Sequence, residues 1–189
     1  CLLIRKDLLD DFIVYSIRSS VCLSSKIPES ILETNVLLLK NHPILIEYAA
    51  FHGSTQILNY LILNHVKYNS NLWSYAIHSN NADLIHILER LNIGLINGTY
   101  KDHILESIKC FHNDISNYWI TNFISENEYK EYESYFFKYY NFQYIVKEMI
   151  NNEFLRYLCQ YDYLYFVQIL FEESENDIKF ETIFKLIFI

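Results

Sequence analysis

The chain has 189 residues, of which 51% are hydrophobic, and it contains only 3 Gly and 2 Pro. So few turn-forming residues exclude a many-stranded sandwich or barrel and favour helices, in one domain or a short repeat array. The formal net charge is −8 and no basic stripe is visible, which argues against a nucleic-acid-binding protein.

Cysteine spacing and hydropathy indicate a cytoplasmic protein. The cysteines at 1, 22, 110 and 159 form no C-x-x-C pair and no disulfide framework, so we expect reduced thiols. We also expect no membrane insertion, because no uncharged apolar run reaches the length of a spanning helix, and no signal peptide, because charges follow at Arg5 and Lys6. The start at Cys1 and the apolar ending "FETIFKLIFI" lead us to expect a piece of a longer protein.

Residues 1–42 form an N-terminal helical flank in this prediction, since "RKDLLDDFIVYSI" is amphipathic and suits half of a helical hairpin. A repeated unit follows, because "IEYAAFHGSTQILNYLILN" and "WSYAIHSNNADLIHILERL" align on a Tyr-Ala step. The steps Tyr48-Ala49 and Tyr75-Ala76 are 75 − 48 = 27 residues apart. Each unit reads as two short helices around a polar break.

The break between the two helices has a specific chemistry. Gly53 and Asn80 occupy the position where a helix ends in a left-handed residue, a conformation that Gly and then Asn adopt most readily. Asp83 falls in the first turn of the next helix, where a negative charge suits the helix dipole. Small residues such as Ala49 and Ala76 on the first helix allow neighbouring hairpins to stack closely.

Looser copies of the unit continue along the chain. They predict five hairpins within 43–171, with first helices near residues 49, 76, 107, 136 and 158, and a truncated further unit at 172–189. Periods of this length are typical of a solenoid. The predicted fold class is therefore an all-α, ankyrin-like solenoid of stacked helical hairpins.

The core "YAAFHGSTQILNYL" resembles the ankyrin repeat, whose central pattern A-A-x-x-G-x-x-x-[IV]-[VL]-x-x-L is matched by Ala49, Ala50, Gly53, Ile57, Leu58 and Leu61. The opening T-P-L-H and the usual hairpin finger are missing. From about Leu8 to Trp119 the chain also resembles the domain of unknown function that precedes ankyrin arrays in the large ankyrin-protein family of trichomonad protists. That resemblance implies an ankyrin-like flank, further ankyrin repeats after Ile189 and no enzyme activity.

Sites for catalysis, cofactors and metals are not expected from local spacing. Cys110 and His112 are two residues apart on a predicted helix, so they project in different directions and make a poor nucleophile–base pair, with Asp114 opening the next helix. The seven His residues include no H-x-x-x-H or H-E-x-x-H pair. The three Gly residues form no phosphate-binding loop.

A partner-binding surface is the remaining hypothesis. In an ankyrin-like hairpin, the two residues between the small pair and the turn face the concave groove. They are Phe51, His52, His78, Ser79, Lys109, Cys110, Lys138, Tyr139, Gln160 and Tyr161. We therefore expect a non-enzymatic protein-interaction scaffold with an unidentified protein partner. The alternatives are a structural cap for the following ankyrin array and, more remotely, a hydrolase on a helical scaffold.

Overall fold

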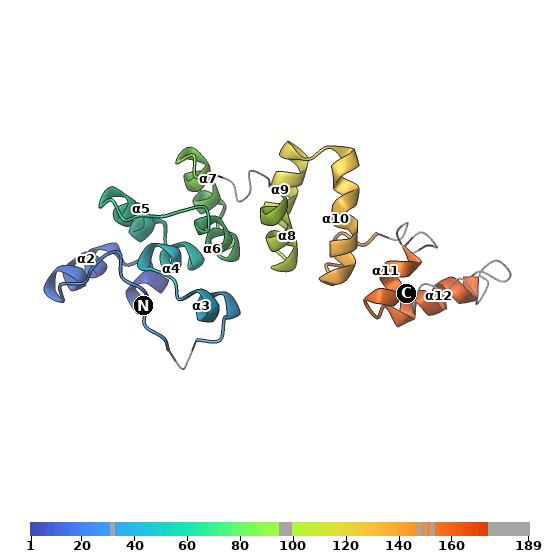
Figure 1. Ribbon diagram of the computed structural model, residues 1–189, viewed down its shortest axis with the longest axis horizontal. Coiled ribbons are helices and arrows are strands. Elements are labelled where there is room, and N and C mark those ends of the chain that lie inside the picture. Colours follow the sequence, from blue (N-terminus) through green and yellow to red (C-terminus); the bar gives the residue numbers. More distant parts are fainter. Residues whose placement is uncertain (31–32, 95–99, 147–148, 150, 152–153, 174–189) are drawn as a thin grey trace. The chain divides into compact units, whose positions relative to one another are not determined.

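The computed structural model describes residues 1–30, 33–94, 100–146, 149, 151 and 154–173 (Figure 1). Within them the regular elements are all α-helices, with one isolated bridge between Lys26 and Ile44, so the predicted all-α class is confirmed for this part of the chain. None of these helices is long and apolar enough to cross a bilayer. The apolar ending from residue 174, with most of the further unit expected there, lies outside the described residues. The chain divides into two compact units, Cys1–Ser116 and Asn117–Ile189.

The first unit is built from consecutive helix pairs. Three pairs contact each other as hairpins, namely α1 with α2, α4 with α5, and α6 with α7. The first helices also contact one another in order, α1 with α4, α4 with α6, and α6 with α8. The helices are α1 (Leu2–Arg5), α2 (Leu9–Arg18), α3 (Val36–Asn41), α4 (Leu45–Phe51), α5 (Thr55–Leu63), α6 (Leu72–His78), α7 (Ala82–Arg90) and α8 (Lys101–Lys109), and α9 (Asn113–Phe123) begins in this unit.

Small residues on the first helices account for this close contact. Ala49, Ala50 and Ala76 are fully buried, with no exposed surface. The second helices turn aliphatic side chains toward the same core, and Ile57, Leu58, Leu61, Leu84 and Leu88 are likewise fully buried. The alanines let the backbones of α4 and α6 approach, while the second helices supply the apolar volume.

The turns between paired helices share one geometry. The left-handed conformations predicted at Gly53 and Asn80 are confirmed, with φ of +69° and +51°. The same region of φ is occupied by Asp7, Phe111, Tyr140 and Asp162 at equivalent turns. In most of these turns the next residue's N–H reaches back to a carbonyl five residues earlier, as Ser54 does to Ala49 at 2.9 Å and His112 to Ser107 at 3.0 Å. This pattern satisfies carbonyls that the helix end leaves free.

Polar side chains tie two of these turns, α1–α2 and α4–α5, to the next hairpin. Asp7, in the α1–α2 turn, accepts hydrogen bonds from the backbone N–H groups of Gln56 and Ile57 at 3.0 Å each, and so caps the N-terminus of α5. Asn81 accepts from the N–H of Leu84 at 3.2 Å and donates from Nδ2 to the carbonyl of Gly53 at 3.2 Å. Neighbouring hairpins are thus held together by turn-to-turn hydrogen bonds as well as by the apolar core.

The Gly53 turn gives a first testable prediction. Gly53→Val is expected to lower the free energy of unfolding by about 2 kcal/mol, because a β-branched residue is strained at positive φ. The new Cβ would also lie 3.2 Å from Asn81 Nδ2, the atom that bonds to the Gly53 carbonyl. Chemical denaturation of the purified chain measures the change.

The matched control is the reverse change in the next turn. Asn80→Gly removes a side chain at φ +51° and should be neutral or slightly stabilising. If Gly53→Val left stability unchanged, the left-handed geometry assigned to this turn would be wrong.

The second unit is packed mainly by aromatic side chains. It contains the rest of α9, followed by α10 (Glu126–Lys138), α11 (Leu155–Gln160) and α12 (Leu164–Glu173), and α11 contacts both α10 and α12. The ring of Phe137 lies 5.6 Å from Phe154, 5.9 Å from Tyr157 and 5.7 Å from Tyr163. Tyr163 also donates from its hydroxyl to the Phe137 carbonyl at 2.9 Å, which joins α12 to the end of α10.

The hairpin expected to begin with α10, the fourth of the five predicted, differs from the repeat. The alignment predicts a second helix after Tyr140, but residues 142–146 are not helical. Tyr144 stacks on Phe136 at 4.5 Å and donates to Asn117 at 2.7 Å, so its side chain is held by tertiary contacts. The β-branched Ile145 and Val146 add little helix propensity, and these contacts decide the local conformation.

Candidate functional site

The residues predicted to bind a partner lie at corresponding places in successive hairpins. Each is at the last residue of a first helix or just after it, on α4, α6, α8, α10 or α11. None is buried, since Lys109, Lys138 and Gln160 are exposed, whereas Phe51, His52, His78, Ser79, Tyr139 and Tyr161 are partly exposed. Their side chains therefore remain accessible at the ends of the first helices.

In the first unit, ring contacts join these positions into a continuous row. The ring of Phe51 stacks on His78 of the next hairpin at 5.5 Å and meets His52 edge-on at 5.1 Å. His52 in turn contacts the buried ring of Tyr48 at 4.5 Å. Partial burial, aided by the charge of Arg5, lowers the pKa of His52. The row therefore begins with closely packed aromatic and imidazole rings.

The row continues into a polar cluster formed by His78, Glu106 and Cys110. His78 Nε2 donates to Glu106 Oε1 at 2.7 Å, and Lys109 Nζ lies 3.2 Å from both oxygens of Glu106. Cys110 Sγ lies 3.6 Å from Nε2 and 3.7 Å from Nδ1 of the same imidazole. The hydrogen bond from His78 is the main cause that lowers the pKa of Glu106, so this carboxyl is ionised at neutral pH.

The cluster is poorly arranged for nucleophilic catalysis. The sulfur is almost equidistant from both ring nitrogens, whereas a thiol aligned for proton transfer would lie much closer to one of them. Burial, followed by the charge of Glu106, raises the pKa of the Cys110 thiol to about 11, which keeps it protonated at neutral pH. A reactive cysteine has the opposite shift. Cys110 thus faces His78 of the preceding hairpin, and its arrangement does not activate it.

An open depression adjoins this cluster. It has a volume of about 450 Å³ and lies between the α3 segment and the ends of α6 and α8. Its lining includes Thr34, Asn35, Val36, Leu37, Lys40, Asn41, His78, Glu106 and Lys109. The volume is in the range of small-ligand sites, but the depression is open, and its walls mix apolar and charged side chains. It therefore differs from the enclosed, mostly apolar pockets that hold small molecules.

The second unit presents a different chemistry at the same positions. Lys138 Nζ lies 5.7 Å from the ring of Tyr135 and 5.5 Å from that of Tyr139, distances at which cation–π attraction operates. The carbonyl of Tyr161 accepts a hydrogen bond from the hydroxyl of Tyr140 at 2.8 Å. Aromatic rings and a cation therefore share the end of α10.

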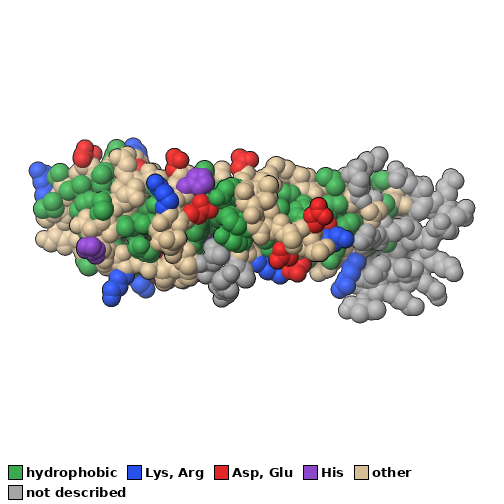
Figure 2. Space-filling model, turned by 90° about the horizontal axis from the view of Figure 1, so that it is seen from above, with side chains coloured by type: hydrophobic (Ala, Val, Ile, Leu, Met, Phe, Trp, Pro, Cys, Tyr) green, Lys and Arg blue, Asp and Glu red, His purple; other side chains and the backbone are tan. Residues whose placement is uncertain are grey.

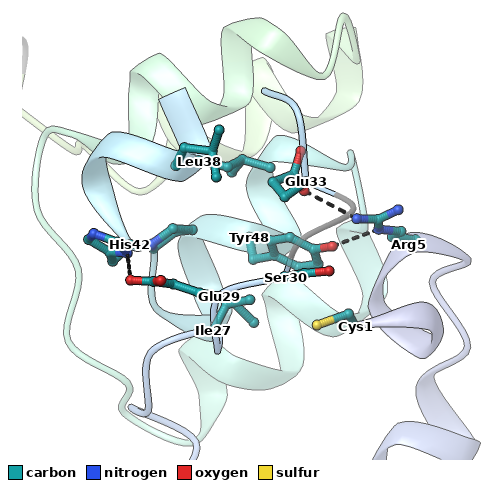
Figure 3. A pocket seen from close by; sticks show the side chains of 11 residues that line it. Cys1, Arg5, Ile27, Glu29, Ser30, Glu33, Leu38, His42 and Tyr48 are labelled. Carbon is teal, nitrogen blue, oxygen red and sulfur yellow. Dashed lines mark hydrogen bonds and ion pairs between the residues drawn. The ribbon is translucent and has the colours of Figure 1, made fainter. Parts of the chain in front are cut away.

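A smaller cavity lies near the N-terminus of the first unit. Figure 3 shows Arg5 between Glu33, at 3.2 Å, and the hydroxyl of Tyr48, at 2.6 Å, with His42 beside Glu29 at 3.4 Å. The cavity has a volume of about 100 Å³, well below that of a typical small-ligand site. Its charged groups already pair with one another, so it is the weaker candidate for a binding site.

Local sequence reasoning missed the cluster of His78, Glu106 and Cys110. Glu106 and Cys110 have the i, i+4 spacing of one helix face, but their partner His78 is 28 residues before Glu106 and belongs to another hairpin. The signal that finds it is the repeat alignment, which puts His78 and Lys109 at equivalent positions and so places α8 beside α6. Comparison with protein-family models, curated proteins and solved structures found no match.

Proposed function

We propose that the chain is a non-enzymatic, cytoplasmic protein-interaction scaffold of ankyrin-like type, which binds a protein partner along the ends of its first helices. It would form the N-terminal part of a longer ankyrin-repeat protein, as the resemblance to the trichomonad family implies. The four free cysteines fit a reducing compartment.

One observation carries the proposal. The ends of the first helices of successive hairpins lie side by side in the first unit, since Phe51 stacks on His78 and His78 donates to Glu106 in the last turn of α8. Repeat proteins bind partners through such rows, because each stacked repeat contributes the same accessible position to one extended surface. The partly exposed rings supply apolar contact area, and the neighbouring charges supply orientation.

The charge distribution favours a protein over a nucleic acid. On the face seen in Figure 2, Lys and Arg side chains are interspersed with Asp, Glu and hydrophobic ones. The net charge of −8 repels a phosphate backbone, whereas single cations such as Lys109 can still pair with a carboxylate of a protein partner.

Affinity capture with a matched pair of charge reversals tests the proposal. The full-length protein is expected to retain specific partners, and Lys109→Glu with Lys138→Glu should remove at least one of them, because each lysine is exposed at the end of a first helix, Lys109 in the first unit and Lys138 in the second. The control is Lys67→Glu with Arg90→Glu, which makes the same change in charge at exposed positions away from the ends of the first helices.

The scaffold is supported if a partner is lost with Lys109→Glu and Lys138→Glu but kept with Lys67→Glu and Arg90→Glu. An unchanged partner list in both pairs contradicts it and favours a cap for the following repeats. A cap makes its own prediction, since deleting the hairpins should then lower the solubility of the array without removing any partner.

A further inference from the structure

Three side chains with different metal-binding chemistry converge between α6 and α8. His78 ends α6, Glu106 lies in the last turn of α8, and Cys110 follows directly after α8. Their donor atoms all lie within 4.8 Å of one another. We propose that His78, Glu106 and Cys110 bind a zinc-class divalent cation, which links the α6–α7 hairpin to α8.

The spacing of the donor atoms suits a tetrahedral ion. Zinc bonds of about 2.0 Å to nitrogen or oxygen and about 2.3 Å to sulfur place neighbouring ligand atoms about 3.3–3.6 Å apart. The distance of 3.6 Å from Cys110 Sγ to His78 Nε2 is within this range, but the sulfur is almost equidistant from both ring nitrogens, so the imidazole must turn to aim the Nε2 lone pair at a shared ion. The pair of His78 and Glu106, at 2.7 Å, must also separate, which rotation of these partly exposed side chains allows.

The donor set selects the kind of metal. Imidazole and thiolate together favour zinc and similar late transition metals, whereas magnesium and calcium prefer oxygen ligands. Three protein ligands leave a fourth position for water, which can enter from the open depression that His78 and Glu106 line.

Neighbouring groups help to hold the ligands. Lys109 approaches both carboxylate oxygens of Glu106, so it can keep Oε2 while Oε1 turns to the ion. The ring of His112, just after the turn at Phe111, interacts with the backbone of His78 and so fixes the end of α6 beside the start of α9. The bound ion takes Cys110 as thiolate, and the thiol proton is released to solvent, one per ion.

Cobalt(II) is the first probe, because its spectrum reports the ligands. The full chain, stripped with a chelator and kept reduced, should bind one cobalt ion with a sulfur-to-cobalt charge-transfer band and the visible bands of tetrahedral coordination. Zinc should displace the cobalt and raise the melting temperature by about 5–10 °C when present at about 100 times its dissociation constant.

Substitutions within the cluster are compared with matched substitutions outside it. Cys110→Ser should abolish the charge-transfer band, and His78→Ala or Glu106→Gln should weaken zinc binding at least about 100-fold. Two controls should bind cobalt and zinc as the unsubstituted chain does. One is Cys159→Ser, at another partly buried cysteine. The other is His86→Ala, in the exposed His86–Glu89 pair of α7, where the two side chains lie 2.9 Å apart.

Helix content of each variant is checked by circular dichroism, and Glu106→Gln, which keeps the side-chain shape, guards against loss of fold. Absence of stoichiometric binding to the unsubstituted chain overturns the proposal. So does a charge-transfer band that persists in Cys110→Ser, or an equal loss of affinity in the controls. Metal binding decides only the proposed metal site, and partner capture decides only the proposed scaffold, so failure of one proposal can be told from failure of the other.

Discussion

Replacing Ala49 with Phe is expected to lower the free energy of unfolding by about 3 kcal/mol or more. Ala49 has no exposed surface, and its helix α4 contacts both α5 and α6. An aromatic ring at this position has no room, so it must separate α4 from a neighbour or force its own side chain off-rotamer. Thermal and denaturant unfolding followed by circular dichroism measure the loss.

The chain offers a close control for this substitution. Ala82 opens α7 and is exposed, so Ala82→Phe adds the same ring without a packing conflict and should change stability by less than about 0.5 kcal/mol. Ala76→Phe should behave like Ala49→Phe, because Ala76 is equally buried on α6. Full stability of Ala49→Phe would mean that the stacking of α4 on α6 is wrongly described.

A second large effect is expected from pH, through the buried imidazole of His103 on α8. His103 is 1% exposed and its ring lies 5.0 Å from that of Trp73. Burial lowers its pKa to about 4, against the small opposing effect of Asp102. Below pH 6.5 the unfolded chain therefore takes up a proton that the folded chain does not. Stability should fall between about pH 6.5 and pH 4, by about 3 kcal/mol from this residue.

Comparing unfolding curves of variants isolates this contribution. His103→Phe keeps an aromatic ring beside Trp73 but cannot take up a proton, so its stability should decline much less than that of the unsubstituted chain as the pH falls to about 4. His86→Ala, at an exposed histidine, should keep the original decline. Parallel curves for His103→Phe and the unsubstituted chain would show that His103 is not buried in its neutral form.

The sequence predicts the helical hairpins well where the chemistry of a turn is local. Gly53 and Asn80 are residue types that adopt positive φ readily, so the breaks at these positions are visible without a structure. Phe111 and Tyr140 have no such preference, and only the repeat alignment places a turn there. The packing of Tyr144 on Phe136 overrides the predicted second helix of the fourth hairpin, because a tertiary contact outweighs a weak local preference.

The candidate site shows the same division between local and long-range information. The row of exposed positions follows from the alignment, since it depends only on where each first helix ends. The convergence of His78, Glu106 and Cys110 depends on the side-chain directions of two hairpins that contact each other, and no spacing rule within one helix contains it. A spacing rule such as H-x-x-x-H covers one helix, whereas His78 meets Glu106 and Cys110 across the boundary between two repeats.

The order of contacts among the first helices also bears on how the first unit opens. Contacts run from α1 to α4, from α4 to α6 and from α6 to α8, so α4 and α6 each have a first-helix neighbour on both sides. In such a chain of pairwise interfaces, loss of an end hairpin costs one interface, whereas opening an interior one costs two. Amide hydrogen exchange should therefore be slower in α4 and α6 than in α1, which contacts a single other first helix among the described elements.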